Sequence, residues 1–307
     1  MLSQPGAPGE HIEDEQVRKL LRHAHSLTGT SGFRTLPWPG CSLSPVRVHS
    51  IAWRTDLELR RLEGARLTDH TDHIVVRTPE NPSYRWGNFI LLAGARETLD
   101  AQVCASRFAA AFPRADYVAV GLDSRPEERP AIAGLAGTGM IREVNAVLTA
   151  DALRAPASRP PEAELRRLHG EKDWRKAVAL RLSADEGSEG PGYREFLERN
   201  MRAVRRVCES GRGAWFGAFR GGEIVSGVGI FDAGRGAARF QVVDTHPAHR
   251  RQGLASSLLA LAGEYAREQL GANTLVIVAD PQYFAIRIYR SLGFRERGQQ
   301  MQLERVR

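Results

Sequence analysis

Three runs rich in β-branched and aromatic residues follow one another in the second half of the chain. They occupy residues 214–219, 223–231 and 238–244, and short stretches rich in glycine separate them. Stretches of this kind join antiparallel strands. The pattern therefore predicts an antiparallel sheet of three strands.

Hydrophobic residues at helical spacing flank this sheet on both sides. Before it, residues 163–170 suggest a first strand, and residues 171–182 and 193–209 carry helical periodicity. After it, a helix begins whose apolar face is formed by Leu254, Leu258, Ala262 and Tyr265. Three elements complete the chain: an apolar strand over 273–279, a short helix within 283–294 that Gly293 ends, and a strand over 299–305.

The first half repeats the end of this order in a shorter form. The expected elements are a strand at 88–94, a helix within 96–112, strands at 116–122 and 143–149, and residues 131–140 in the place of the short helix. Aligning Gly139 with Gly293 gives an offset of 154 residues (293 − 139), which also places Ala131 on Ala285 and Ile132 on Ile286. This order predicts an internal duplication.

A stretch rich in proline and small residues separates the two halves. It covers 154–162 and is typical of a linker, with a boundary near residue 158. We therefore expect an N-terminal extension over 1–45, a first domain over 46–153 and a second domain over 163–307.

The composition is that of a globular protein, with 42% hydrophobic and 26% charged residues among 307. No apolar run approaches the ~18 residues that span a bilayer. The N-terminus has neither the basic start nor the apolar centre of a secretion signal, so we expect a cytoplasmic protein without a membrane partner. Cys41, Cys104 and Cys208 lie far apart, which argues against a disulfide framework and a structural zinc site.

The formal net charge of +7 and the isoelectric point near 9.7 allow anionic partners. The basic residues are scattered along the chain, and no cluster of Lys and Arg is interleaved with aromatic residues. Nucleic acid is therefore not the expected partner.

The junction over 245–263 carries the candidate chemistry. Pro247, Arg250, Arg251 and Gly253 come directly before the apolar helix. A helix N-terminus offers unpaired N–H groups and a partial positive charge that phosphate oxygens can use. Gly253 allows close approach of the backbone to a compact anion such as a pyrophosphate. On these residues alone, an ordinary helix start with solvated arginines is the alternative.

Two motifs in this half resemble the GNAT superfamily of acetyl-CoA-dependent N-acyltransferases. The family's phosphate motif, Q/R-x-x-G-x-G/A, is matched by Arg250, Arg251, Gln252, Gly253, Leu254 and Ala255. The family's short helix, which has Ala, Tyr and Gly-Phe at intervals of four residues, is matched by Ala285, Tyr289, Gly293 and Phe294. The resemblance covers roughly residues 163–305. It implies an α/β fold with a mixed sheet and two tandem GNAT-like domains, of which the first is degenerate.

The resemblance also implies how acetyl-CoA would bind as the acyl donor. The strand that ends at Thr245 would separate from the strand over 273–279, and the pantetheine arm would lie between them. The backbone N–H of Val243 would polarise the thioester carbonyl, an interaction typically worth about 3 kcal/mol of the barrier. Tyr289 would protonate the leaving thiolate. Gln282 stands where the family commonly has Asn, and it keeps an amide.

The acceptor amine must lose a proton during such a reaction. Asp244, His246 and Glu223 lie on or beside the central strands, and each is a candidate for the base or for a relay through water. The resemblance implies neither a metal nor a covalent enzyme intermediate.

The first half departs from the family at the same positions. Under the offset of 154 residues (293 − 139), the phosphate motif falls on Arg96, Glu97, Thr98, Leu99 and Asp100, and Leu135 replaces Tyr289. Two carboxylates in this place would repel a pyrophosphate, so we predict that the first half does not bind CoA. Two other stretches there suggest a metal cluster (69–73) or a partner contact (81–89). We interpret them as a polar loop and as an aromatic turn that covers a sheet edge.

Several functions fit these observations. The leading interpretation is an N-acetyltransferase that transfers acetyl directly from acetyl-CoA to a primary amine of a small molecule or a protein; a homodimer stays open. A non-catalytic acyl-CoA sensor or scaffold would keep Gly253 but would not need Tyr289. A mycothiol synthase-like enzyme is a third interpretation, because that enzyme is also a tandem member of similar length.

Overall fold

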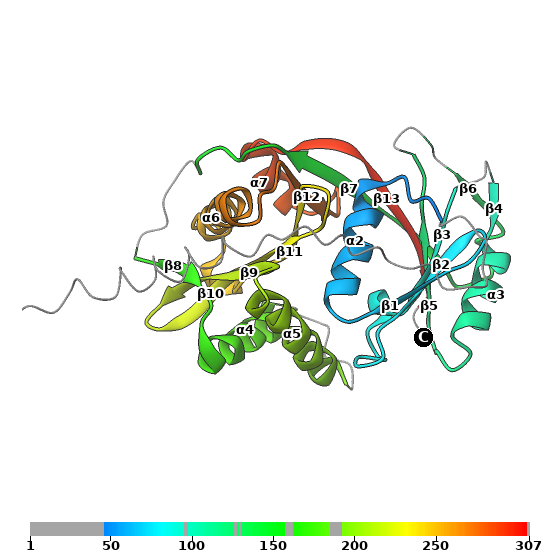
Figure 1. Cartoon of the computed structure of the whole chain (residues 1–307), viewed down its shortest axis with the longest axis horizontal. Coiled ribbons are helices and arrows are strands. Elements are labelled where there is room, and N and C mark those ends of the chain that lie inside the picture. Colours follow the sequence, from blue (N-terminus) through cyan, green and yellow to red (C-terminus); the bar gives the residue numbers. More distant parts are fainter. Residues whose placement is uncertain are drawn as a thin grey trace, which may run out of the picture. The chain divides into compact units, whose positions relative to one another are not determined.

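The structure is a computed structural model that describes residues 46–94, 98–125, 128, 130–156, 162–184 and 192–305 (Figure 1). The predicted extension over 1–45 and residues 157–161 of the predicted linker lie outside the described residues, as do Arg96 and Glu97. Within the described ranges, no helix is long and apolar enough to cross a membrane.

Both halves of the described chain contain helices and strands. The first half contains α2 (Ile51–Leu62), β1 (Arg66–Asp69), β2 (His73–Arg77), the 3-10 helix η1 (Arg85–Gly87), β3 (Phe89–Leu92), β4 (Thr98–Asp100), α3 (Ala101–Ala111), β5 (Val118–Leu122), β6 (Ala131–Ala133) and β7 (Ile141–Ala150). The second half contains β8 (Glu164–Arg167), α4 (Gly170–Ala184), α5 (Tyr193–Glu209), β9 (Gly213–Arg220), β10 (Glu223–Asp232), β11 (Ala237–Thr245), the 3-10 helix η2 (Pro247–His249), α6 (Leu254–Gln269), β12 (Thr274–Ala279), α7 (Ala285–Ser291) and β13 (Arg295–Arg305).

The two halves share one mixed sheet of 11 strands, in the order β1-β2-β3-β5-β13-β7-β12-β11-β10-β9-β8. In this sheet, the antiparallel strands β1 to β3 lead to the parallel pair of β3 with β5. The antiparallel strands β8 to β11 lead in the same way to the parallel pair of β11 with β12. The last strand of each half then pairs with the other half: β7 with β12, and β13 with β5. Because β7 and β13 also pair with each other (Figure 1), continuous backbone hydrogen bonds connect the halves.

Helices cover both faces of the strands β9 to β11. Alternate residues of one strand point to opposite faces, so Phe216 packs in the core beneath α6 and α7, while Trp215 packs in the core beneath α4 and α5. Figure 1 shows α6 and α4 on opposite sides of these strands. The mixed sheet with helices on both faces is the predicted α/β fold.

The second half follows the predicted order of elements, whereas the first half departs from it at two places. The helix expected within 96–112 covers only α3, and β4 comes before it. Residues 131–140, which the offset aligned with a helix, form β6 and turns; β6 pairs in parallel with β4. Gly134, Gly137 and Gly139 all have positive φ angles, and an α-helix cannot continue through them.

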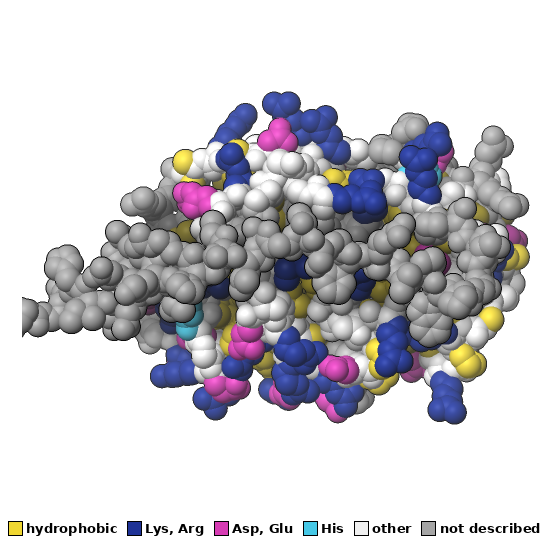
Figure 2. Space-filling model, viewed as in Figure 1, with side chains coloured by type: hydrophobic (Ala, Val, Ile, Leu, Met, Phe, Trp, Pro, Cys, Tyr) yellow, Lys and Arg dark blue, Asp and Glu magenta, His cyan; other side chains and the backbone are white. Residues whose placement is uncertain are grey.

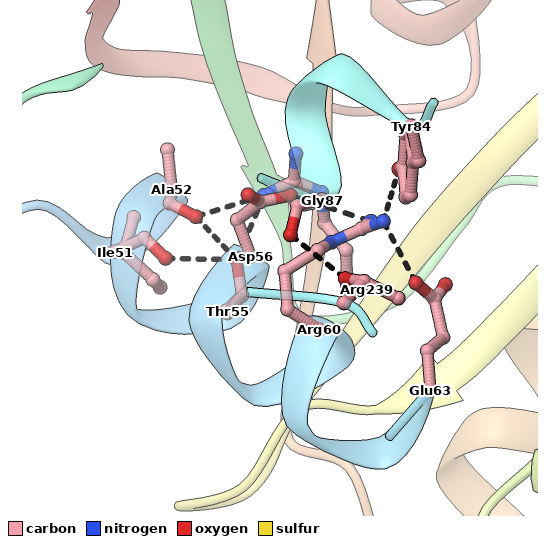
Figure 3. Close-up of polar contacts among 10 residues, drawn as sticks. Ile51, Ala52, Thr55, Asp56, Arg60, Glu63, Tyr84, Gly87 and Arg239 are labelled. Carbon is pink, nitrogen blue, oxygen red and sulfur yellow. Dashed lines mark hydrogen bonds and ion pairs between the residues drawn. The ribbon is translucent and has the colours of Figure 1, made fainter. Parts of the chain in front are cut away.

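The aromatic turn 81–87 packs inward, against α5 and α2. The side chain of Asn81 donates to the carbonyl of Phe196 at 3.0 Å, and the ring of Tyr84 lies 5.2 Å from the ring of Phe196. Tyr84 also accepts a hydrogen bond from Arg60 (Figure 3). The interpretation as a turn over a sheet edge is therefore incomplete, because this turn connects the first half to a helix of the second.

A buried charged cluster lies where α2 meets β11 (Figure 3). Arg60 is 2.7 Å from Glu63 and 3.6 Å from Asp56. Arg239 on β11 donates from Nη1 to the carbonyl of Ala52 at 3.0 Å, and burial lowers its pKa to about 10. Burial also raises the pKa of Glu63, which the neighbouring Arg60 opposes. Each charge in this cluster therefore depends on its partner.

We expect Arg60→Met to lower the free energy of unfolding by about 3 kcal/mol, because it leaves the Glu63 carboxylate buried without its cation. Arg61→Met is the matched control on the same helix; Arg61 has a side chain 67% exposed, and its loss should cost less than about 0.5 kcal/mol. Urea titrations of both variants measure the difference. Equal losses would show that the buried cluster contributes no more than a surface ion pair.

Candidate active site

Two adjacent strands separate in the second half. β11 and β12 pair only from Ala237 to Arg239 on β11, although β11 continues to Thr245 and β12 to Ala279. The parallel pair of the first half does not separate: β3 and β5 remain paired to Leu92, and the N–H of Asp123 then donates to the carbonyl of Leu92 at 2.8 Å. Only the second-half pair therefore opens a gap at the end of its strands.

A β-bulge lies on β11 beside this gap. Val228 of β10 is opposite Val243, and Gly229 is opposite Gln241, so Val242 has no partner in the register. Val242 has a φ of +54°, which is rare for a β-branched residue. A bulge bends its strand and changes the direction of the following groups. The residues after it, Val243 and Asp244, line a cavity of about 440 Å³.

The loop between η2 and α6 forms a second wall of this cavity. Arg251 has a φ of +60°, and Gly253, the N-cap of α6, has a φ of +77°. No side chain caps α6. Its first N–H groups therefore have no intrahelical partner and no capping oxygen, the arrangement in which helix starts bind anions.

Side chains from β9 to β11 hold this loop in place. Arg220 donates to the amide oxygen of Gln252 at 2.5 Å, and Arg250 donates from Nε to the carbonyl of Thr245 at 3.3 Å. The hydroxyl of Thr245 lies 2.9 Å from that of Ser226. Gln252 and Arg250 thus position the loop in addition to any contact with a ligand.

Helix α7 forms the third wall through Ala285, Ile288 and Tyr289. Tyr289 is only 6% exposed. Burial raises the pKa of its hydroxyl to about 12, and Tyr283 and Asp244 contribute in the same direction. The cavity therefore contains a tyrosine that stays protonated at any physiological pH.

The three candidate bases have different surroundings. Asp244 lines the cavity, and its carboxylate accepts from Arg181 of α4 at 3.2 Å. Glu223 does not line it: its side chain is 70% exposed and pairs with Lys176 at 2.9 Å. His246 does not line it either, and its Nδ1 accepts from the N–H of Ala248 at 3.3 Å as the cap of η2.

The other predicted residues meet at this cavity, with one exception. The lining includes Val243, Asp244, Thr245, Arg250, Arg251, Gln252, Gly253, Leu254, Ala255 and Tyr289. Gln282 is exposed and lies outside the lining. The sequence reasoning missed further lining residues: Ala184, His249, Ser256, Tyr283, Phe284, Arg287 and Ile288. Of these, Tyr283 and Phe284 directly precede the recognised helix motif, and Arg287 and Ile288 lie within it; this proximity was the available signal.

The corresponding helix start in the first half is closed. Asp100 caps α3, and its carboxylate accepts from the N–H of Val103 at 2.9 Å. The preceding residues pair with β6 as β4. A carboxylate and a strand thus occupy the place that an anion takes at an open helix start.

The stretch 69–73 spans the polar turn between β1 and β2: Asp69 ends β1, and His73 begins β2. The rings of His70 and His73 stack with centroids 4.4 Å apart, and Asp72 pairs with His73 at 2.9 Å and with Arg107 at 2.5 Å. Within the described ranges, no group of three or more His, Cys, Asp or Glu residues is arranged to hold a metal ion.

Residues 181–294, which include all three walls of the cavity, match the Acetyltransferase (GNAT) family. This match is confined to the second half and indicates a region similar to GNAT acetyltransferase domains. A stretch of 107 residues is 24% identical to N-acetyltransferase family 8 member 2 of Rattus norvegicus; it covers 33% of this chain and 47% of that protein. This chain therefore spans about half the length of that relative.

Solved structures share the fold of this chain. A GCN5-related N-acetyltransferase from Kribbella flavida has a TM-score of 0.56 at 19% identity, over 83% of this chain and 96% of its own. A conserved protein of unknown function from Staphylococcus epidermidis has a TM-score of 0.59 at 13% identity, over 79% of this chain and 94% of its own. At these identities the likeness establishes the fold alone.

Proposed function

We propose that this protein is an N-acetyltransferase that transfers acetyl from acetyl-CoA to a primary amine at one site in its second half. The observation that carries the proposal is the cavity itself. One space brings together an uncapped helix start, a gap between two parallel strands and a buried protonated tyrosine. Donor binding, carbonyl activation and protonation of the leaving group need these three features.

The donor fits the wall formed by the loop and α6. A pyrophosphate would lie against the N–H groups at Gly253, Leu254 and Ala255, where the αL glycine has no side chain to occupy the space. Arg250 and Arg251 supply positive charge beside it. When bound, acetyl-CoA supplies an activated thioester. The gap between β11 and β12 would hold its pantetheine arm.

The chemistry is assigned to Val243 and Tyr289. The N–H of Val243, just after the bulge, donates to the thioester oxygen and stabilises the charge that develops there. Tyr289 gives its proton to the leaving thiolate. Both residues line the same cavity.

Asp244 is assigned to the acceptor, because it is the candidate base that reaches the cavity. Its carboxylate attracts an ammonium group and takes the proton, directly or through water. Arg181 keeps that carboxylate oriented from α4. We further propose that the first half supports the sheet and binds no CoA, since Asp100 caps its helix and its strands do not separate.

The pH dependence follows from Tyr289. An acid acts only while protonated, so a pKa of about 12 keeps Tyr289 active through pH 10 and removes it only above that. We expect kcat to show no decline from about pH 8 to about pH 10, whereas a tyrosine with an ordinary pKa of about 10 would halve it at pH 10. A kcat profile, with folding checked by circular dichroism at each pH, measures this. A decline centred near pH 10 would contradict the assignment.

A panel of primary amines tests the activity. The expected result is release of CoA thiol that depends on the amine, together with an acetylated amine detected by mass spectrometry. Binding of acetyl-CoA without turnover of any amine or protein acceptor would favour the non-catalytic sensor. Absence of binding would contradict both functions.

A further inference from the structure

Arg239 lies at the point where β11 and β12 separate. It is the last residue of β11 that pairs with β12, opposite Val276, and it precedes the bulge at Val242. Beyond Arg239, β11 pairs only with β10, and beyond Val276, β12 pairs only with β7. The direction that β11 takes after Arg239 therefore sets the width of the gap and the place of the Val243 N–H.

The side chain of Arg239 binds a helix of the first half. Arg239 is only 5% exposed, and its Nη1 donates to the carbonyl of Ala52 at 3.0 Å and to the hydroxyl of Thr55 at 2.8 Å (Figure 3). Both acceptors belong to α2. Ile51 of the same helix packs against the apolar cluster that contains Val276. Helix α2 thus contacts β11 and β12 where the gap begins.

This buried arginine has two neutral acceptors. Burial lowers the pKa of Arg239 to about 10, and the carboxylate of Asp56 opposes this lowering. Asp56 and Glu63 form their ion pairs with Arg60. Replacing a buried charge by an apolar side chain of similar volume is often neutral or stabilising. The contact thus costs the solvation of a charge and gains two directed hydrogen bonds, which fix the position of β11 on α2.

We propose that Arg239 is a positioning residue through which the first half sets the geometry of the active site. This inference rests on the proposed function, in which the N–H of Val243 donates to the thioester oxygen. Arg239 does not line the cavity, so it acts only through β11. Both sides of the gap depend on the first half: β7 pairs with β12 up to Ala279, and α2 binds β11 through Arg239.

Arg239→Met removes both hydrogen bonds and keeps an apolar side chain in their place. The two acceptors keep partners within α2, because the hydroxyl of Thr55 lies 2.8 Å from the carbonyl of Ile51 and 3.0 Å from that of Ala52. We expect kcat to fall about tenfold, since a displaced N–H stabilises the developing oxyanion less well. The dissociation constant of acetyl-CoA, measured by calorimetry, and the unfolding temperature should not change.

Thr55→Val tests the same contact from the first half. It keeps the shape of the side chain and removes the hydroxyl that accepts from Arg239, so kcat should fall about threefold. The double variant should lose no more than Arg239→Met alone, because both substitutions remove one contact. Thr78→Val is the matched control: this buried threonine of the first half donates to the carbonyl of Gly87 at 2.7 Å. It should lower the unfolding temperature and leave kcat unchanged.

The carbonyl of bound acetyl-CoA gives a readout that needs no acceptor. A hydrogen bond to a carbonyl lowers its stretching frequency, and isotope-edited infrared spectra of acetyl-CoA labelled at the acetyl carbonyl measure it. The frequency should be higher in Arg239→Met and in Thr55→Val than in the wild type and in Thr78→Val.

The outcomes distinguish this inference from the function on which it rests. If the wild type binds acetyl-CoA and Arg239→Met keeps both its kcat and its carbonyl frequency, the positioning assignment is wrong. If Arg239→Met and Thr78→Val lose kcat in proportion to their loss of stability, Arg239 only stabilises the fold, and the assignment is again overturned. If the wild type does not bind acetyl-CoA at all, the proposed function itself is wrong.

Discussion

Replacing Gly253 with Asp is expected to abolish the thermal stabilisation of this protein by acetyl-CoA. At 100 times its dissociation constant, a ligand adds about 2.7 kcal/mol, which is several degrees in the unfolding temperature. The substitution acts in two ways. A Cβ is strained at a φ of +77°, and a carboxylate at the N-cap places negative charge on the N–H groups assigned to the pyrophosphate.

Gly192→Asp is the matched control. Gly192 is also an N-cap in the αL conformation, with a φ of +89° before α5, and a Cβ there would meet no atom within 4 Å. Both variants should lose a similar amount of stability without ligand, of order 1 kcal/mol. Only Gly253→Asp should lose the shift with acetyl-CoA. A shift that persists in Gly253→Asp, or that vanishes in both variants, would remove the assignment of the anion to this loop.

Replacing Tyr289 with Phe should lower kcat by about 100-fold or more and leave the dissociation constant of acetyl-CoA unchanged. The substitution removes only the hydroxyl that gives its proton to the thiolate, and general acids contribute about 10²–10⁴. The ring, which packs against Phe294 with centroids 6.3 Å apart, is retained. Affinity and turnover therefore separate in this variant.

Tyr265→Phe provides the comparison for Tyr289→Phe. Tyr265 lies on α6 outside the cavity lining, and its hydroxyl is 3.5 Å from the carbonyl of Gly213. Its loss should leave kcat unchanged. Full activity of Tyr289→Phe, or an equal loss in both variants, would show that Tyr289 packs its helix without acting as the acid.

The elements of the second half could be predicted because the apolar residues of each one recur at a spacing typical of a helix or a strand. Leu197, Met201 and Val204 recur at helical spacing on α5 and are buried, so one amphipathic face identifies the helix. The exchange of β7 and β13 between the halves carries no such signal. It depends on pairs distant in sequence, such as Met301 with Leu122, which local patterns do not encode.

The sequence pointed to those candidate residues that belong to short continuous motifs. Gly253, Ala285 and Tyr289 stand in short patterns, and the structure places all three at one cavity. The bulge was missed, because valine normally avoids the positive φ that Val242 adopts and pairing with β10 imposes it. Gln282, which was predicted from family spacing alone, is exposed and lies outside the lining. In the first half, Asp100 was recognised as a charge but not as the cap of α3.

The stoichiometry of acetyl-CoA binding tests the central claim most directly. Calorimetric titration should give one site per chain, with equal affinity in the wild type and in Gly192→Asp, and no measurable site in Gly253→Asp. One site per chain agrees with the two helix N-termini: no side chain caps α6, whereas Asp100 caps α3. Two sites per chain, or one site that survives in Gly253→Asp, would contradict the account.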